Sequence, residues 1–121
     1  MDKGDNKMVG TNNKEEIKGY IEDLLRSIQR KFEAKERDTL GLLGEDVELT
    51  DEELLAYKFV NLETDKRERE FIFKRYLSEE EIEQKDLQDE LGITKPTYYR
   101  MREKFLLRLN NYLKVNGFGY N

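Results

Sequence analysis

Residues 85–101, KDLQDELGITKPTYYRM, predict two short helices that meet at a sharp turn. Gly92 permits the positive φ that such an interhelix turn requires. Apolar residues fall where they allow both helices to close over one shared core: Leu87, Leu91, Ile93, Tyr98 and Met101. This spacing is typical of a helix-turn-helix.

The second helix of this unit is expected to begin near Thr94–Pro96 and to end near Val115. Thr94 can act as the N-cap, and Pro96 suits the first turn, where its missing N–H would have no partner. Because proline disfavours helical dihedrals in the residue before it, Lys95 in the cap position is the alternative. At 100° per residue, one helix face collects the side chains expected in the core: Tyr98, Met101, Phe105, Leu109 and Tyr112.

The charge of the chain is divided unequally. The 121 residues have a formal net charge of −5, yet residues 92–121 hold six Lys or Arg and a single acid, Glu103. The rest of the chain holds 16 basic and 26 acidic residues. A basic end on an acidic chain indicates a polyanionic partner. The other interpretation is a solvated helix that happens to be basic.

The outward face of the second helix carries residue types that bind duplex DNA. A recognition helix touches base edges in the major groove with its first turns, where Arg and Lys donate to guanine. The candidates for base contacts are Lys95, Thr97, Tyr99 and Arg100, and those for phosphate contacts are Thr94, Arg102 and Lys104. Double-stranded DNA is therefore the partner that we expect for the basic end.

Composition excludes several classes of site. The chain has no Cys and no His, which excludes disulfides, zinc sites built from these residues, and triads with a His base or a Cys nucleophile. No apolar run approaches the roughly 20 residues of a membrane span, and the first ten residues lack an apolar signal core. We expect a protein of the bacterial host cytoplasm that is no enzyme and uses no cofactor, metal or membrane.

The expected fold is all-α: a small helical domain with a C-terminal helix-turn-helix and a long N-terminal amphipathic helix. Residues 1–13 are polar, contain two glycines and are expected to be a flexible tail. Residues 14–60 are expected to be a helical region for packing or dimerisation, with apolar residues three and four apart up to about Arg37. Residues 61–115 contain the helix-turn-helix, and residues 116–121 are expected to fray.

Capping residues predict where the other helices begin. Thr50-Asp-Glu-Glu matches a capping box that opens a helix over about 51–60. Thr64 is the expected N-cap of a helix over about 65–77. Ser78-Glu-Glu-Glu is a second capping-box match and is expected to restart a helix that ends before the glycine of the turn.

A combination of short motifs covers residues 66–113, KREREFIFKRYLSEEEIEQKDLQDELGITKPTYYRMREKFLLRLNNYL. They are an ERE-FI helix, a short acidic link, a helix ending in Leu-Gly-Ile, a Thr-x-x-Thr-Tyr-Tyr-Arg helix and a Leu-rich end. In these features the stretch resembles the C-terminal half of the ArpU/RinA-type phage late transcription regulators. That half is in turn similar to region 4 of sigma factors.

The resemblance implies an activator of phage late genes, or of autolysin-type genes in Gram-positive hosts, with RNA polymerase as a further candidate partner. It implies that the operator is faced by Thr94, Lys95, Thr97, Tyr99 and Arg100. Gln88 departs from the pattern, because helix-turn-helix proteins usually have Ala or Gly there to let the helices approach. Wider packing is expected at this point.

Other interpretations stay open at the level of sequence. The chain could be the small subunit of a phage packaging terminase, which also carries a helix-turn-helix but assembles into rings. It could also be a protein-interaction module whose basic helix docks an acidic partner. A homodimer is a further hypothesis, because three leucines make the last helix apolar nearly all round: Leu106, Leu107 and Leu113.

Overall fold

The computed structural model describes residues 2–38, 40–42, 44–63 and 65–121, with the side chains of residues 13–38, 40–42, 44, 47–63 and 65–121. This part of the chain is helical and has no strand, which confirms the all-α class. In chain order the elements are α1 (Asp2–Arg37), the 3-10 turn η1 (Gly44–Val47), α2 (Asp51–Leu62), α3 (Lys66–Ile72), the π-helical turn η2 (Phe73–Leu77), α4 (Gln84–Leu91) and α5 (Lys95–Val115).

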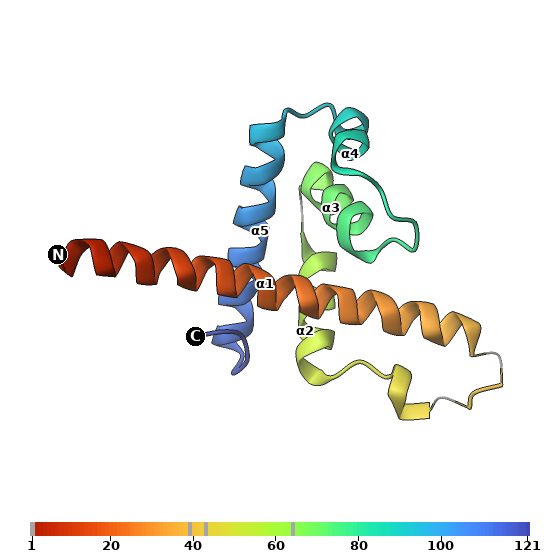
Figure 1. The fold of residues 1–121 in the computed structure, drawn as a ribbon. Coiled ribbons are helices and arrows are strands. Elements are labelled where there is room, and N and C mark those ends of the chain that lie inside the picture. The colour runs from red at the N-terminus through yellow and green to blue at the C-terminus, as the bar shows by residue number, and fades with distance from the viewer. Residues whose placement is uncertain (1, 39, 43, 64) are drawn as a thin grey trace.

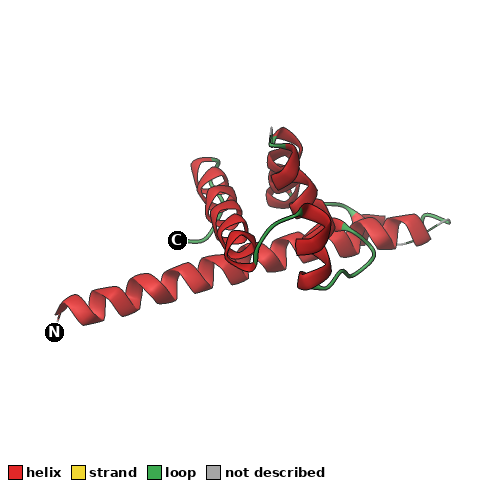
Figure 2. Cartoon of the chain, turned by 90° about the horizontal axis from the view of Figure 1, so that it is seen from above, coloured by secondary structure: helices red, strands yellow, loops and turns green. Residues whose placement is uncertain are grey.

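The long helix α1 crosses the other helices and packs against α5, η2 and α2 (Figure 1). Seen from above, α5 and α2 stand side by side on the same side of α1 (Figure 2). The short helices α3 and α4 lie beside the N-terminal half of α5 (Figure 1). Helix α1 therefore supports α5, and α5 in turn packs against α4.

The predicted apolar stripe of α1 lies in the core. Ile21, Leu25 and Ile28 are fully buried, and their neighbours on the same face are partly buried. Burying one such side chain contributes roughly 1.5–3 kcal/mol. On α5, Tyr98, Phe105 and Leu109 are buried as predicted from the 100° spacing, with Met101 and Tyr112 partly buried beside them.

The remaining leucines of α5 are covered within one chain. Leu106 and Leu113 are fully buried, and Leu107 is half-buried. Because α1 and α2 of the same chain pack against α5, the leucines that motivated the homodimer hypothesis are covered without a second copy.

Three of the predicted helix ends are confirmed. The Thr50 hydroxyl accepts from the Glu53 amide at 3.2 Å, while Glu53 Oε1 accepts from the Thr50 amide at 2.8 Å, which completes the capping box. Gly92 ends α4 with φ 64° and ψ 38°, a left-handed conformation that glycine adopts without strain. Thr94 is the N-cap of α5, so the alternative with Lys95 in the cap position is wrong.

Other predicted boundaries are corrected by the structure. Helix α1 begins at Asp2 rather than near Lys14, so residues 2–13, which were expected to be a tail, are helical in the structure. No proline interrupts this stretch, and a helix that is already packed extends at the gain of one backbone hydrogen bond per residue. The Thr64 prediction lies outside the described residues; Asp65 caps α3 and accepts from the Glu68 amide at 2.9 Å.

The second capping box does not form. The Ser78 hydroxyl accepts from the amide of Glu80, only two residues on, at 3.2 Å. That local turn removes the acceptor that the third residue of a helix would need. The chain therefore continues without helix through residues 79–83, and α4 begins at Gln84.

The C-terminal residues fold back instead of fraying. Asn110, which is 2% exposed, donates from its side-chain amide to the Tyr120 carbonyl and accepts from the Tyr120 amide, at 2.9 and 2.7 Å. The Tyr120 ring lies 5.7 Å from that of Tyr20 on α1. A buried asparagine needs such partners, and the tail supplies them.

Candidate nucleic-acid interface

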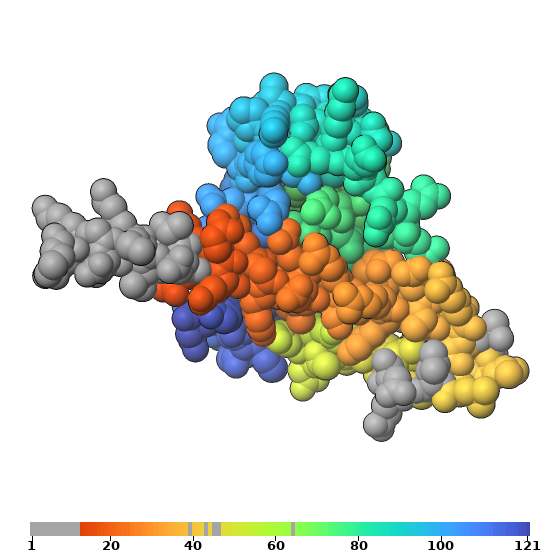
Figure 3. All heavy atoms as spheres, viewed as in Figure 1, coloured from red at the N-terminus to blue at the C-terminus, as the bar shows by residue number. Residues whose placement is uncertain are grey.

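The turn between α4 and α5 places the first turns of α5 at an outer end of the molecule. The Ile93 amide donates to the Gln88 carbonyl at 3.0 Å, and the Gly92 amide donates to that of Asp89 at 3.3 Å, which closes the end of α4. Figure 3 shows α4 and the start of α5 as a lobe that stands clear of α1. Side chains on this lobe are accessible to a large partner.

The four residues proposed for base contacts gather on this lobe, at the start of α5. Lys95, Tyr99 and Arg100 are exposed, and Thr97 is half-buried. Arg100 Nη2 donates to Thr97 Oγ1 at 3.2 Å, so this guanidinium is held along the helix without an opposite charge. Thr94 is engaged in the cap: its hydroxyl accepts from the Thr97 amide at 3.4 Å and donates to Thr97 Oγ1 at 3.0 Å.

Two cations farther along α5, Lys104 and Arg108, are paired with carboxylates of other elements. Lys104 Nζ lies 3.6 Å from Glu68 on α3, although the Lys104 side chain stays 63% exposed. Arg108 reaches both Glu63 and Glu68, at 3.2 and 3.5 Å. Within the described part of the chain, by contrast, neither Lys95 nor Arg100 has a carboxylate partner. Of the three α5 cations that have no carboxylate partner among the described residues, Lys95 and Arg100 therefore lie at the outer end and Lys114 lies near the opposite end.

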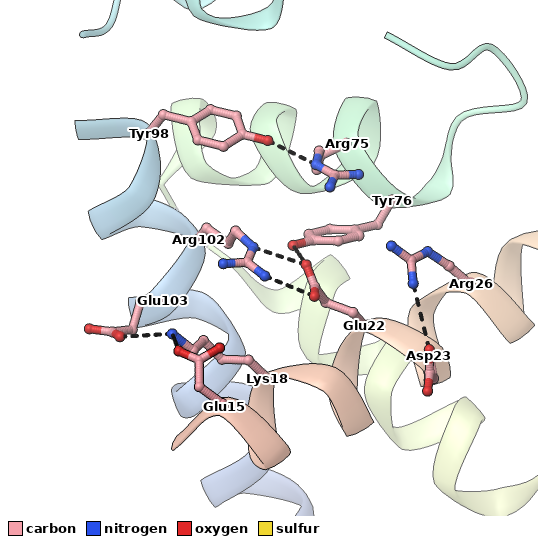
Figure 4. Close-up of polar contacts among 10 residues, drawn as sticks. All are labelled: Glu15, Lys18, Glu22, Asp23, Arg26, Arg75, Tyr76, Tyr98, Arg102 and Glu103. Atoms are coloured by element: carbon pink, nitrogen blue, oxygen red, sulfur yellow. Dashed lines mark hydrogen bonds and ion pairs between the residues drawn. The ribbon is translucent and has the colours of Figure 1, made fainter. Parts of the chain in front are cut away.

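Arg102, a predicted phosphate contact, lies in a polar tie between α5 and α1 (Figure 4). Its Nε and Nη2 donate to the two carboxylate oxygens of Glu22, each at 2.9 Å, and the Tyr76 hydroxyl donates to the same carboxylate at 2.7 Å. Burial raises the pKa of Glu22, but the hydrogen bonds from Arg102 and Tyr76 outweigh burial and leave the pKa lowered. Arg102 is thus held by Glu22 and its side chain is only 24% exposed, which makes it less accessible to a phosphate than Lys104.

A second tie holds the start of α5 against η2. Arg75 Nε donates to the Tyr98 hydroxyl at 2.8 Å, and the Arg75 guanidinium lies 5.0 Å from the Tyr76 ring centroid (Figure 4). Tyr98 also meets the Phe71 ring edge-on at 5.1 Å. The π-helical turn thus presents Arg75 toward α5 and Tyr76 toward α1, and a π turn of this kind is frequent at functional sites.

Two glutamines on α4, Gln84 and Gln88, belong to the same surface; the sequence indicated Gln88 only as a departure from the usual small residue and gave neither a role in DNA binding. Gln84 Oε1 accepts from the Tyr99 hydroxyl at 3.2 Å, and Gln84 Nε2 donates to Gln88 Oε1 at 3.0 Å. Their spacing of four residues beside the buried Leu87 was the available signal. It shows a shared helix face, but it does not show which helix that face meets.

The positive charge of Lys95 and Arg100 does not continue into the neighbouring groove. That groove, of about 720 Å³, lies between α1 and the segment from η2 to the start of α4. Its lining includes three arginines but also four glutamates: Arg26, Arg30 and Arg75, and Glu33, Glu79, Glu80 and Glu81. Positive charge is therefore offset there, unlike at the outer end of α5.

Other kinds of site are not evident in the described part of the chain. Among the described residues, no group of three or more Asp or Glu is placed to hold a metal ion. No helix in that part of the chain has the length and apolar character needed to cross a bilayer. Comparisons with protein-family models, curated proteins and solved structures found no match to this chain.

Proposed function

We propose that the chain is a sequence-specific transcription regulator that binds double-stranded DNA and reads the major groove with the start of α5. One observation carries this proposal: Lys95 and Arg100 project from the outer lobe without carboxylate partners, while Arg102, Lys104 and Arg108 are each paired to acids. Two unpaired cations at the outer end of a helix, on a chain that is acidic overall, favour a polyanion at that end.

The shape of the lobe is consistent with groove binding. Helix α5 has 21 residues, or about 30 Å at 1.5 Å per residue, and its exposed start is mounted on the short helix α4. The major groove is about 12 Å wide and admits one α-helix. In this proposal α4, the three-residue turn and α5 act as a helix-turn-helix, with α5 as the recognition helix.

The residues take separate roles in this interface. Lys95 and Arg100 donate to guanine or to phosphates near the groove edge. Tyr99, which is 45% exposed, supplies an apolar ring, while its hydroxyl donates to Gln84. The choice of target genes, phage late or autolysin-type, rests only on the resemblance of residues 66–113.

A salt titration of binding to mixed-sequence duplex DNA tests the proposal. The logarithm of the native binding constant should fall linearly with the logarithm of the salt concentration, with a slope of about −0.9 per phosphate neutralised. The double variant Lys95→Glu/Arg100→Glu should bind at least roughly tenfold more weakly and with a slope smaller by about two units.

A matched variant separates local charge from total charge. Lys58→Glu/Lys114→Glu changes two exposed lysines away from the lobe and alters the net charge by the same amount. It should bind nearly as well as the native chain. Absence of native binding at low salt, or equal losses in the two double variants, would refute DNA binding by the start of α5.

A further inference from the structure

A chain of hydrogen bonds links α4 to the exposed end of α5. The Tyr99 hydroxyl donates to Gln84, and the Gln84 amide donates to Gln88, at 3.2 and 3.0 Å. Both hydrogen bonds run in the same direction, from Tyr99 to Gln84 and from Gln84 to Gln88. Gln88 therefore acts as an acceptor only, and both N–H groups of its side-chain amide remain unused. No described residue accepts a hydrogen bond from that nitrogen, and the Gln88 side chain is only half-buried.

Tyr99 is fixed on two sides before any partner binds. Its hydroxyl is held by Gln84, and its ring meets the Tyr98 ring edge-on at 5.5 Å. Tyr98 is 2% exposed and is itself held by Arg75. An exposed aromatic side chain that is already ordered loses less conformational freedom on binding, which is the benefit of preorganisation.

Packing alone does not account for the glutamine pair. A glutamine pair four residues apart on an exposed helix stabilises it by only a few tenths of a kcal/mol. Here Gln84 reaches out of its own helix to α5, and the chain of bonds ends in an amide with unused donors. Glutamine amides are among the groups that donate to DNA phosphates.

We propose that α4 forms part of the DNA interface. Gln84 is a positioning residue that holds Tyr99 for base contact, and Gln88 donates its unused amide N–H to a DNA phosphate. This inference rests on the function proposed above and names two residues that the recognition-helix pattern does not include.

The role of Gln84 is tested by sequence discrimination. An operator is first selected from a random duplex pool with the native chain, and its affinity is compared with that of mixed-sequence duplex. Gln84→Ala and Tyr99→Phe should each lower this affinity ratio about three- to tenfold, because each removes the same hydrogen bond. The double variant should lose no more than either single variant.

Asn111→Ala is the matched control. Asn111 is an exposed amide near the other end of α5, so the affinity ratio should not change. An unchanged ratio in Gln84→Ala, or a double variant whose loss is the product of the two single losses, would overturn the positioning role.

The role of Gln88 is tested by Gln88→Glu, which retains the oxygen that accepts from Gln84 and replaces the unused N–H groups by a negative oxygen. Affinity for operator and for mixed duplex should fall by the same factor, about tenfold, because a phosphate contact carries no sequence information. Asn111→Asp makes the same charge change on an exposed residue near the other end of α5 and should have little effect. Equal effects of the two variants would overturn the phosphate contact.

The outcomes separate the two levels of the proposal. A native chain that binds no duplex refutes the proposed function and this inference with it. A native chain that selects an operator, while Gln84→Ala and Gln88→Glu behave like their controls, refutes only the inclusion of α4.

Discussion

Arg102→Met is expected to destabilise the fold while leaving the DNA-binding surface intact. The substitution removes both hydrogen bonds to Glu22, a residue that is 8% exposed, and leaves its carboxylate with Tyr76 and little water. Removing one partner of a fully buried ion pair costs about 3–5 kcal/mol. Because the Arg102 side chain is 24% exposed, water offsets part of this cost, and we expect about 2–3 kcal/mol.

The assay is urea unfolding followed by helical circular dichroism, with Lys104→Met as the matched control. Lys104 also faces a glutamate, but its side chain is 63% exposed, so its loss should cost less than about 1 kcal/mol. In the cycle with Glu22→Gln, the double variant should lose clearly less than the sum of the single variants.

Two results would contradict this reasoning. One is a cost for Arg102→Met no larger than that for Lys104→Met. The other is a change in the salt dependence of DNA binding. At a temperature where the variant is folded, we expect its salt slope on duplex DNA to equal the native slope. A slope smaller by about 0.9 would return Arg102 to the phosphate contacts.

Three further predictions concern pH, the interhelix turn and the C-terminal tail. Because the folded state lowers the pKa of Glu22 from its ordinary 4.5, its contribution to stability is present at neutral pH and is lost as pH falls below that value through the folded pKa. The difference in unfolding free energy between native chain and Glu22→Gln should therefore shrink between about pH 5 and pH 3. Gly92→Ala should lower stability by about 1–2 kcal/mol in thermal unfolding, through φ strain alone, since no atom lies near the added Cβ. Gly19→Ala in α1, equally unhindered, should raise stability by up to about 1 kcal/mol. Asn110→Ala should cost about 1–3 kcal/mol and speed proteolysis of the tail that holds Tyr120; an unchanged cleavage rate would refute the docking.

Features determined by neighbours in the chain were predictable from the sequence. The Thr50 capping box, the left-handed Gly92 and the Thr94 cap each depend on atoms a few residues apart, so the local pattern contains the required groups. The apolar stripes of α1 and α5 were predictable for a related reason, because helical periodicity alone decides which side chains share a face. These features sufficed for the all-α class and for the outward position of Lys95 and Arg100.

Tertiary structure decided which charges remain available. Arg100 and Arg102 lie two residues apart in one basic run, yet only Arg102 has a carboxylate partner, Glu22, which is 80 residues away in sequence. Two further contacts also require tertiary structure: the hydrogen bond from Arg75 of the π turn to Tyr98, and the docking of the C-terminal tail on Asn110. The Arg102–Glu22 pair depends on where α1 crosses α5, and that crossing is set by the packing of whole helix faces rather than by any local pattern. Sequence by itself therefore determined the all-α class and the buried faces of α1 and α5, whereas long-range packing decided which cations of α5 are paired with carboxylates and which are not.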